Sequence, residues 1–128
     1  MTEPERARGL WRLLAVGWTL AVFAACALPG AALRDVAILT ADKLLHAVSF
    51  FVFAVLWRGS GTGVWRVAAG GVAFAVWIEW WQATVAVGRF ADPFDALADV
   101  LGLALGLWTF RAVFRARDAR ARRQRPPG

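Results

Sequence analysis

Cysteine and histidine are scarce in this chain of 128 residues, since each occurs once, as Cys26 and His46. A single cysteine excludes an intrachain disulfide, and the spacing of a zinc finger is absent as well. The sequence also lacks a nucleophile elbow, a zinc-protease motif and a phosphate-binding loop. It therefore contains no recognised catalytic or nucleotide-binding motif, and we expect no cofactor.

Polar residues are also few for so short a chain. Hydrophobic residues make up 59% of the sequence, and the mean hydropathy is +0.52. A soluble domain of this length could not bury so much apolar surface, whereas a membrane protein exposes it to lipid. The net charge of +6 comes largely from a basic C-terminal run, which is better explained by membrane topology than by nucleic-acid binding. We therefore expect membrane lipids as partners and no nucleic acid.

Four apolar stretches predict an all-α, polytopic membrane protein with four transmembrane helices. The first reads as an ordinary apolar anchor that ends at Pro29-Gly30. The second is short between Lys43 and Arg58, so its helix should begin earlier and carry charged residues into the membrane zone. The expected spans are about residues 10–28, 38–57, 64–87 and 94–114, between an N-terminal tail of residues 1–9 and a basic tail of residues 115–128.

Positive charge orients these four spans. With the N-terminus inside, only Arg34, Lys43 and Arg89 fall outside, and the other arginines lie on the cytoplasmic side. Four tryptophans then come near one cytoplasmic interface, as in an aromatic belt: Trp11, Trp57, Trp65 and Trp108. Both termini are therefore expected in the cytoplasm, and the protein is expected in the cell (inner or plasma) membrane as a multi-pass protein.

Polar residues in the predicted spans converge at the outer ends of the second, third and fourth spans. An ionisable residue in a membrane span is costly, so each needs a reason to be there. Residues three or four apart share one helix face, which pairs 42 with 46, 79 with 82, and 95 with 99. The face of the fourth span continues through Gly102 and Gly106, a small-residue stripe that permits close helix approach. The candidate site residues are Asp42, Lys43, His46, Glu79, Gln82, Arg89, Asp95 and Asp99.

This predicted cluster contains an excess of negative charge. Lys43 and Arg89 face the carboxyl groups of Asp42, Glu79, Asp92, Asp95 and Asp99. A medium of low dielectric constant does not tolerate unpaired carboxylates. Some of them must be protonated, His46 must be charged, water must enter, or a cation must bind.

The ordered polar motifs resemble those of the VanZ-like family of bacterial membrane proteins. The motifs are Asp42-Lys43-Leu44-Leu45-His46, Glu79-Trp80-Trp81-Gln82, Arg89, and an Asp95–Gly102 helix segment. The chain has Phe50 where the family often has tyrosine, and Asp99 where the family has asparagine. The first departure removes a hydroxyl group and the second adds a carboxyl group. The resemblance implies a role in the bacterial cell envelope, related to glycopeptide (teicoplanin) resistance, but it supplies no established reaction.

Several functions are compatible with the cluster. One is a pocket on the extracytoplasmic side that binds a lipid-linked envelope precursor or a glycopeptide. A second is a membrane-embedded hydrolase or transferase, with His46 beside Glu79 or Asp95 as general acid or base and with Lys43 and Arg89 holding a phosphate or carboxylate. A third is a structural network that fixes helix register, in which Lys43 pairs with Asp42 or Glu79 and Arg89 pairs with Asp95.

A metal ion would relieve the charge imbalance, with His46, Glu79, Asp95 and Asp99 as its ligands. The chain has one histidine, however, and the spacing matches no known metal site. We therefore expect no metal, and of the three functions above we favour the ligand-binding pocket.

Overall fold

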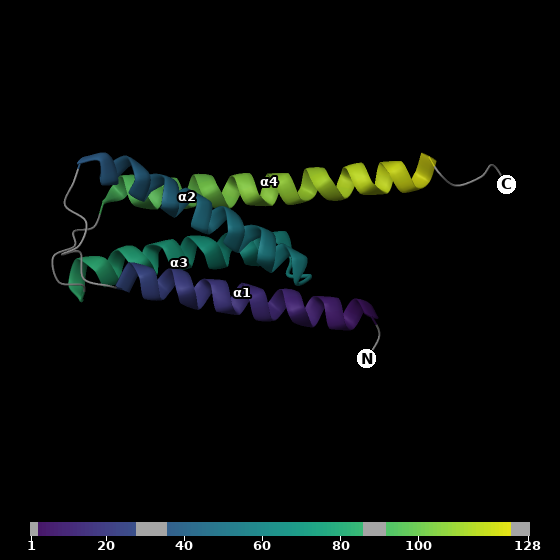
Figure 1. Ribbon diagram of the computed structural model, residues 1–128, viewed down its shortest axis with the longest axis horizontal. Coiled ribbons are helices and arrows are strands. Elements are labelled where there is room, and N and C mark those ends of the chain that lie inside the picture. Colours follow the sequence, from purple (N-terminus) through teal and green to yellow (C-terminus); the bar gives the residue numbers. More distant parts are fainter. Residues whose placement is uncertain (1–2, 28–35, 86–91, 124–128) are drawn as a thin grey trace.

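The protein consists of four α-helices in the computed structural model, which describes residues 3–27, 36–85 and 92–123. The helices are α1 (Glu3–Ala27), α2 (Val36–Gly59), α3 (Val64–Thr84) and α4 (Pro93–Arg123). The start of α1, the turn between α2 and α3, and the end of α4 all lie at one end of the bundle (Figure 1). The prediction of an all-α chain with four helices is confirmed, and parts of both predicted tails are helical as well.

Short polar segments set the ends of the helices. Gly61 has a φ of 87° in the turn between α2 and α3, a conformation that suits glycine, and the Ser60 hydroxyl donates to the Trp57 carbonyl over 2.7 Å. This is the tight hairpin that the glycine-rich segment predicts. At the start of α4, the Asp92 carboxylate accepts from the Phe94 backbone N–H over 2.9 Å, and Pro93 is the first helical residue. Asp92 is therefore a helix N-cap, as expected.

The helices α2 and α4 pack with their backbones in contact. A Cβ at Gly102 would overlap the Ala47 carbonyl, and one at Gly106 would lie 2.6 Å from the Phe51 carbonyl oxygen and 2.8 Å from the Ala54 Cβ. The small residues Gly102 and Gly106 of α4 thus permit the close helix approach that the sequence predicts. This approach also turns the polar face of α4, which carries Asp95 and Asp99, toward α2.

Aromatic and aliphatic side chains join α2 to α3. Phe50, Phe53 and Phe74 form a group of rings whose centroids lie 5.6–5.9 Å apart, and Ile78 is buried in the same core. Trp18 joins α1 to α2 beside this core, because its indole N–H donates to the Ser49 carbonyl over 2.9 Å. The polar cluster thus lies on a core shared by all four helices.

The outer surface of all four helices carries large apolar side chains. Exposed ones among the described residues include Leu13 on α1 (73% exposed), Leu44 on α2 (64%), Trp65 on α3 (83%) and Trp108 on α4 (67%). Within the part of the chain that the structure describes, two helical segments are long and apolar enough to cross a membrane, Glu5–Ala27 and Pro93–Arg117. Segments of α2 and α3 do not meet the same criterion; the described part of α2 carries Asp42, Lys43 and Arg58, and α3 contains four tryptophans and two ionisable residues.

We predict that Gly102→Ala destabilises the protein by about 1–3 kcal/mol, because the added methyl group forces α2 and α4 apart. The matched control is Gly17→Ala on α1, where an added Cβ meets nothing within 4 Å. That change should be neutral or stabilising by up to about 1 kcal/mol, since alanine is a better helix former than glycine. Thermal unfolding of the purified protein in detergent measures both variants, and equal midpoints would contradict the close contact.

Candidate functional site

Lys43 on α2 is paired with two carboxylates at the start of α4. Its ammonium group donates to Asp92 Oδ2 over 2.6 Å and to Asp95 Oδ1 over 2.8 Å. The hydrogen bond from Lys43, together with the one from the Phe94 backbone, lowers the pKa of Asp92 below its ordinary value. The expected pairing of Lys43 with Asp42 or Glu79 is therefore wrong. Asp42 is its neighbour in sequence, and adjacent residues of a helix point in different directions.

His46 and Asp99 form a buried pair one turn deeper between the same two helices. His46 Nδ1 lies 2.9 Å from Asp99 Oδ1, and the two residues are 6% and 0% exposed. We expected Glu79 or Asp95 beside the histidine, but its hydrogen-bond partner is the residue at which the chain departs from the VanZ pattern. An ionised Asp99 can only accept, so it would hold the hydrogen on Nδ1 and leave Nε2 for another partner.

Glu79 on α3 joins the cluster through the backbone of α4. One of its carboxylate oxygens accepts from the Asp92 N–H over 3.1 Å. Its other oxygen, Oε1, and Asp99 Oδ2 are buried without a hydrogen-bond partner in the described part of the chain. Buried oxygens of this kind are normally satisfied by a donor, a water or an ion. The site is thus short of donors.

Of the predicted site residues that the structure describes, Asp42 and Gln82 do not belong to these pairs. Gln82 is buried, but its amide donates to the Cys26 carbonyl of α1 over 3.4 Å and not to the carboxylates. Arg89 lies outside the described residues, and so does its expected pairing with Asp95. Phe50, which replaces the tyrosine of the VanZ pattern, is 1% exposed in the aromatic core.

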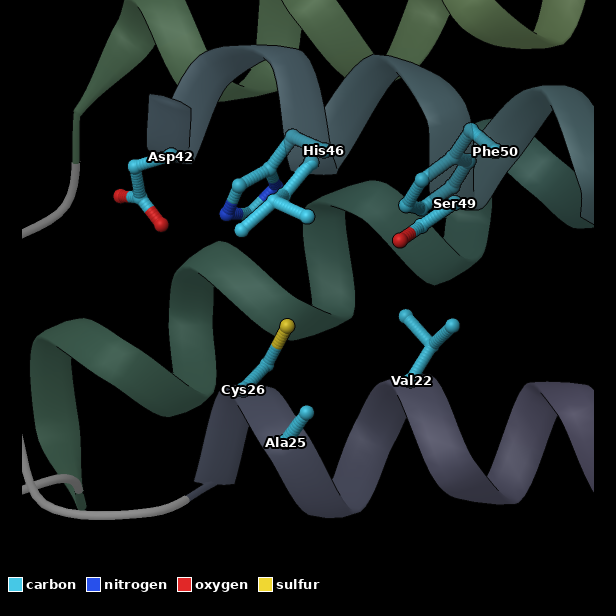
Figure 2. Close-up of a pocket in the computed structure, with 8 residues that line it drawn as sticks. Val22, Ala25, Cys26, Asp42, His46, Ser49 and Phe50 are labelled. Carbon is cyan, nitrogen blue, oxygen red and sulfur yellow. The ribbon is translucent and has the colours of Figure 1, made fainter. Parts of the chain in front are cut away.

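A cavity of about 240 Å³ lies between α1 and α2 beside this cluster. Figure 2 shows Asp42, His46 and Ser49 of α2 on one side and Val22, Ala25 and Cys26 of α1 on the other. The polar residues of the lining therefore come from α2, which also contributes Leu45 and Phe50, and the α1 residues are small or apolar. Sequence reasoning missed the contribution of α1, because small and apolar residues in a first span carry no signal that separates a cavity wall from an ordinary anchor.

A metal ion could be held at one point of the cluster. Ligand atoms of Asp42, His46 and Asp95 all lie within 4.8 Å of one another. This set differs from the predicted one, since Asp42 takes the place of Glu79 and Asp99. Lys43 already donates to Asp95 over 2.8 Å, and its positive charge would oppose a cation there. The arrangement therefore suits hydrogen-bond donors at least as well as a metal.

We predict that the pair of His46 and Asp99 is coupled by about 1.5–3 kcal/mol, the range for a hydrogen bond to a charged group. A double-mutant cycle with His46→Leu and Asp99→Leu, followed by unfolding in detergent, measures this coupling. Asp99→Asn keeps an acceptor for Nδ1–H and should cost less than Asp99→Leu. A coupling near zero would show that the two side chains do not interact.

Comparison with known proteins identifies the family. The model of the VanZ/LLP1 family matches residues 7–115, which is most of the chain. No curated protein and no solved structure matches the sequence. The matched range includes all eight of the predicted site residues, and the resemblance seen in their motifs is confirmed. The chain belongs to the VanZ/LLP1 family.

Proposed function

We propose that this VanZ-family protein crosses the cell membrane four times, with both termini in the cytoplasm, and binds the polar part of a lipid-linked envelope precursor or a glycopeptide on the extracytoplasmic side. Large apolar side chains on the outside of all four helices support membrane placement. The distribution of arginines supports the orientation. This topology places the polar cluster and its cavity at the outer ends of α2 and α4.

The observation that carries the binding proposal is the two-sided cavity between α1 and α2. Its polar side offers Asp42 and His46, and its apolar side offers Val22 and Ala25. Leu45 lines the same cavity and is 63% exposed, so the cavity borders the apolar outer surface. A lipid-linked molecule could place its polar group against α2 and leave its chain in the bilayer.

The charge of the site favours a ligand that donates hydrogen bonds. Lys43 is engaged by Asp92 and Asp95, whereas Asp42 forms no hydrogen bond or ion pair within the described residues. Amine and amide N–H groups, which envelope peptides and glycopeptides carry, would donate to the Asp42 carboxylate, which lines the cavity.

A second candidate is a hydrolase or transferase that acts on the same class of molecule. The specific observation in its favour is the buried contact of 2.9 Å between His46 Nδ1 and Asp99 Oδ1. A carboxylate that orients a histidine in this way leaves Nε2 to accept a proton from a nucleophile in the cavity. In this function His46 is the general base and Asp99 is a positioning residue.

We predict that thiol labelling in a Cys26→Ala background will show the proposed orientation of the four spans. A membrane-impermeant thiol reagent should label Ala32→Cys in intact cells, because residue 32 lies in the proposed outer connection between the first two spans. Gly63→Cys, between α2 and α3, should react only after the cells are permeabilised. The opposite pattern would place the cavity on the cytoplasmic side.

We predict that the purified full-length protein binds a lipid-linked peptidoglycan precursor or teicoplanin saturably. Asp42→Asn and His46→Gln should each weaken binding about tenfold or more, since a charge-assisted hydrogen bond contributes about 1.5–3 kcal/mol. Arg66→Gln, on α3 and away from this cavity, is the control and should bind like the wild type. Affinity for the precursor and for teicoplanin is measured by titration in detergent.

The same samples distinguish the alternatives. A product formed from the precursor, with kcat reduced about 100-fold or more in His46→Gln while binding persists, indicates the enzyme. Failure of both probes to bind, together with loss of protein abundance in Asp42→Asn and His46→Gln, indicates a structural polar network and contradicts the binding pocket.

A further inference from the structure

A second and larger cavity, of about 680 Å³, lies at the opposite end of the bundle from His46. It is lined by arginines from three helices, which are Arg8 of α1, Arg58 of α2, and Arg111 and Arg115 of α4. These residues lie near the start of α1, the turn after α2 and the C-terminal half of α4, which share one end of the molecule (Figure 1). None of the functions considered above uses this cavity.

Contacts within the protein place two of these arginines. The Arg58 guanidinium lies 5.1 Å from the centre of the Phe110 ring and donates to the Thr62 carbonyl. The aliphatic stem of Arg8 passes over the turn, because its Cδ would lie 3.9 Å from a Cβ at Gly61. The cavity is thus built around a fixed turn and does not depend on the basic tail alone.

The lining lacks negative charge. No carboxylate is among the lining residues in the described part of the chain, so four arginines line the cavity without an acidic residue among them. An anion with two phosphates would relieve the repulsion between their charges better than a single phosphate. The floor is apolar, with Leu107, Phe110 and Phe114 beside the arginines, and Phe114 is 46% exposed on the outer surface. These apolar side chains offer a free phosphate no favourable contact, whereas they can pack against the acyl chains of a lipid.

We propose that this cavity is a binding site for an anionic phospholipid, with a diphosphatidyl lipid of the cardiolipin type preferred over lipids with one phosphate. Basic pockets between membrane helices on the cytoplasmic side suit such headgroups. The guanidinium groups hold the phosphates, and the acyl chains run along α4 past Phe110 and Phe114. The inference rests on the proposed membrane placement but not on any ligand in the His46 cavity.

Native mass spectrometry of the full-length protein in mild detergent tests this site. Cardiolipin should bind more tightly than phosphatidylglycerol, and phosphatidylcholine should not be retained. Arg8→Gln and Arg111→Gln should each weaken cardiolipin binding about fivefold, the effect of one arginine near an anionic headgroup. Arg66→Gln removes the same charge from a residue that lines a different cavity and should change the affinity by less than about twofold.

Three outcomes would overturn the site. Equal losses of cardiolipin affinity in Arg66→Gln and Arg111→Gln would mean that the lipid is attracted by the overall positive charge of the protein and not by this cavity. Retention of phosphatidylcholine equal to that of cardiolipin would mean that the arginines do not select anionic headgroups. Complete displacement of cardiolipin by inorganic diphosphate at micromolar concentration would assign the cavity to a soluble anion. None of these results bears on the thiol-labelling pattern, so failure of the lipid site and failure of the proposed topology remain distinguishable.

Discussion

The backbone contact between α2 and α4 is the constraint on which the rest of the structure depends. Gly102 and Gly106 leave no room for a side chain against Ala47 and Phe51, so α4 can meet α2 with one face only. Asp95 and Asp99 precede the glycines on that face, and they are brought against Lys43 and His46. The outer surfaces of these helices are largely apolar. The charged groups are tolerated because the close contact buries them, paired with one another, between α2 and α4.

The close contact explains why the polar groups pair across helices and not along them. Each of Lys43 and His46 on α2 finds its carboxylate on α4, and Glu79 of α3 accepts from the backbone at the start of α4. Such bonds fix the helices against one another, and in the proposed membrane placement they would act where lipid supplies no hydrophobic force between helices. Asp42 and His46 also line the cavity that α2 forms with α1. The cavity therefore lies on the side of α2 that α4 does not cover.

Sequence patterns predicted which residues share a face, because that depends on helix periodicity alone. The Asp92 cap, the hairpin at Gly61, and the inward face of Asp95, Asp99 and Gly102 all follow from local rules. The partners did not follow, because they depend on how far one helix slides along another. A slide of one turn, about 5.4 Å, changes which carboxylate meets a given cation. For this reason Lys43 was matched with the wrong carboxylates and the role of Asp99 was missed.

Asp99 makes the site of this protein more acidic than the VanZ pattern. An asparagine could also accept the hydrogen of His46 Nδ1, so orienting the ring does not require a carboxylate at this position. A second oxygen, Asp99 Oδ2, remains buried without a partner in the described residues. Burying an extra charge is costly unless something compensates it, and His46, 2.9 Å away, is the nearest group that can do so. Because Asp99 does not line the cavity, the carboxylate that it adds can act there only through His46, which lines the cavity and pairs with Asp99.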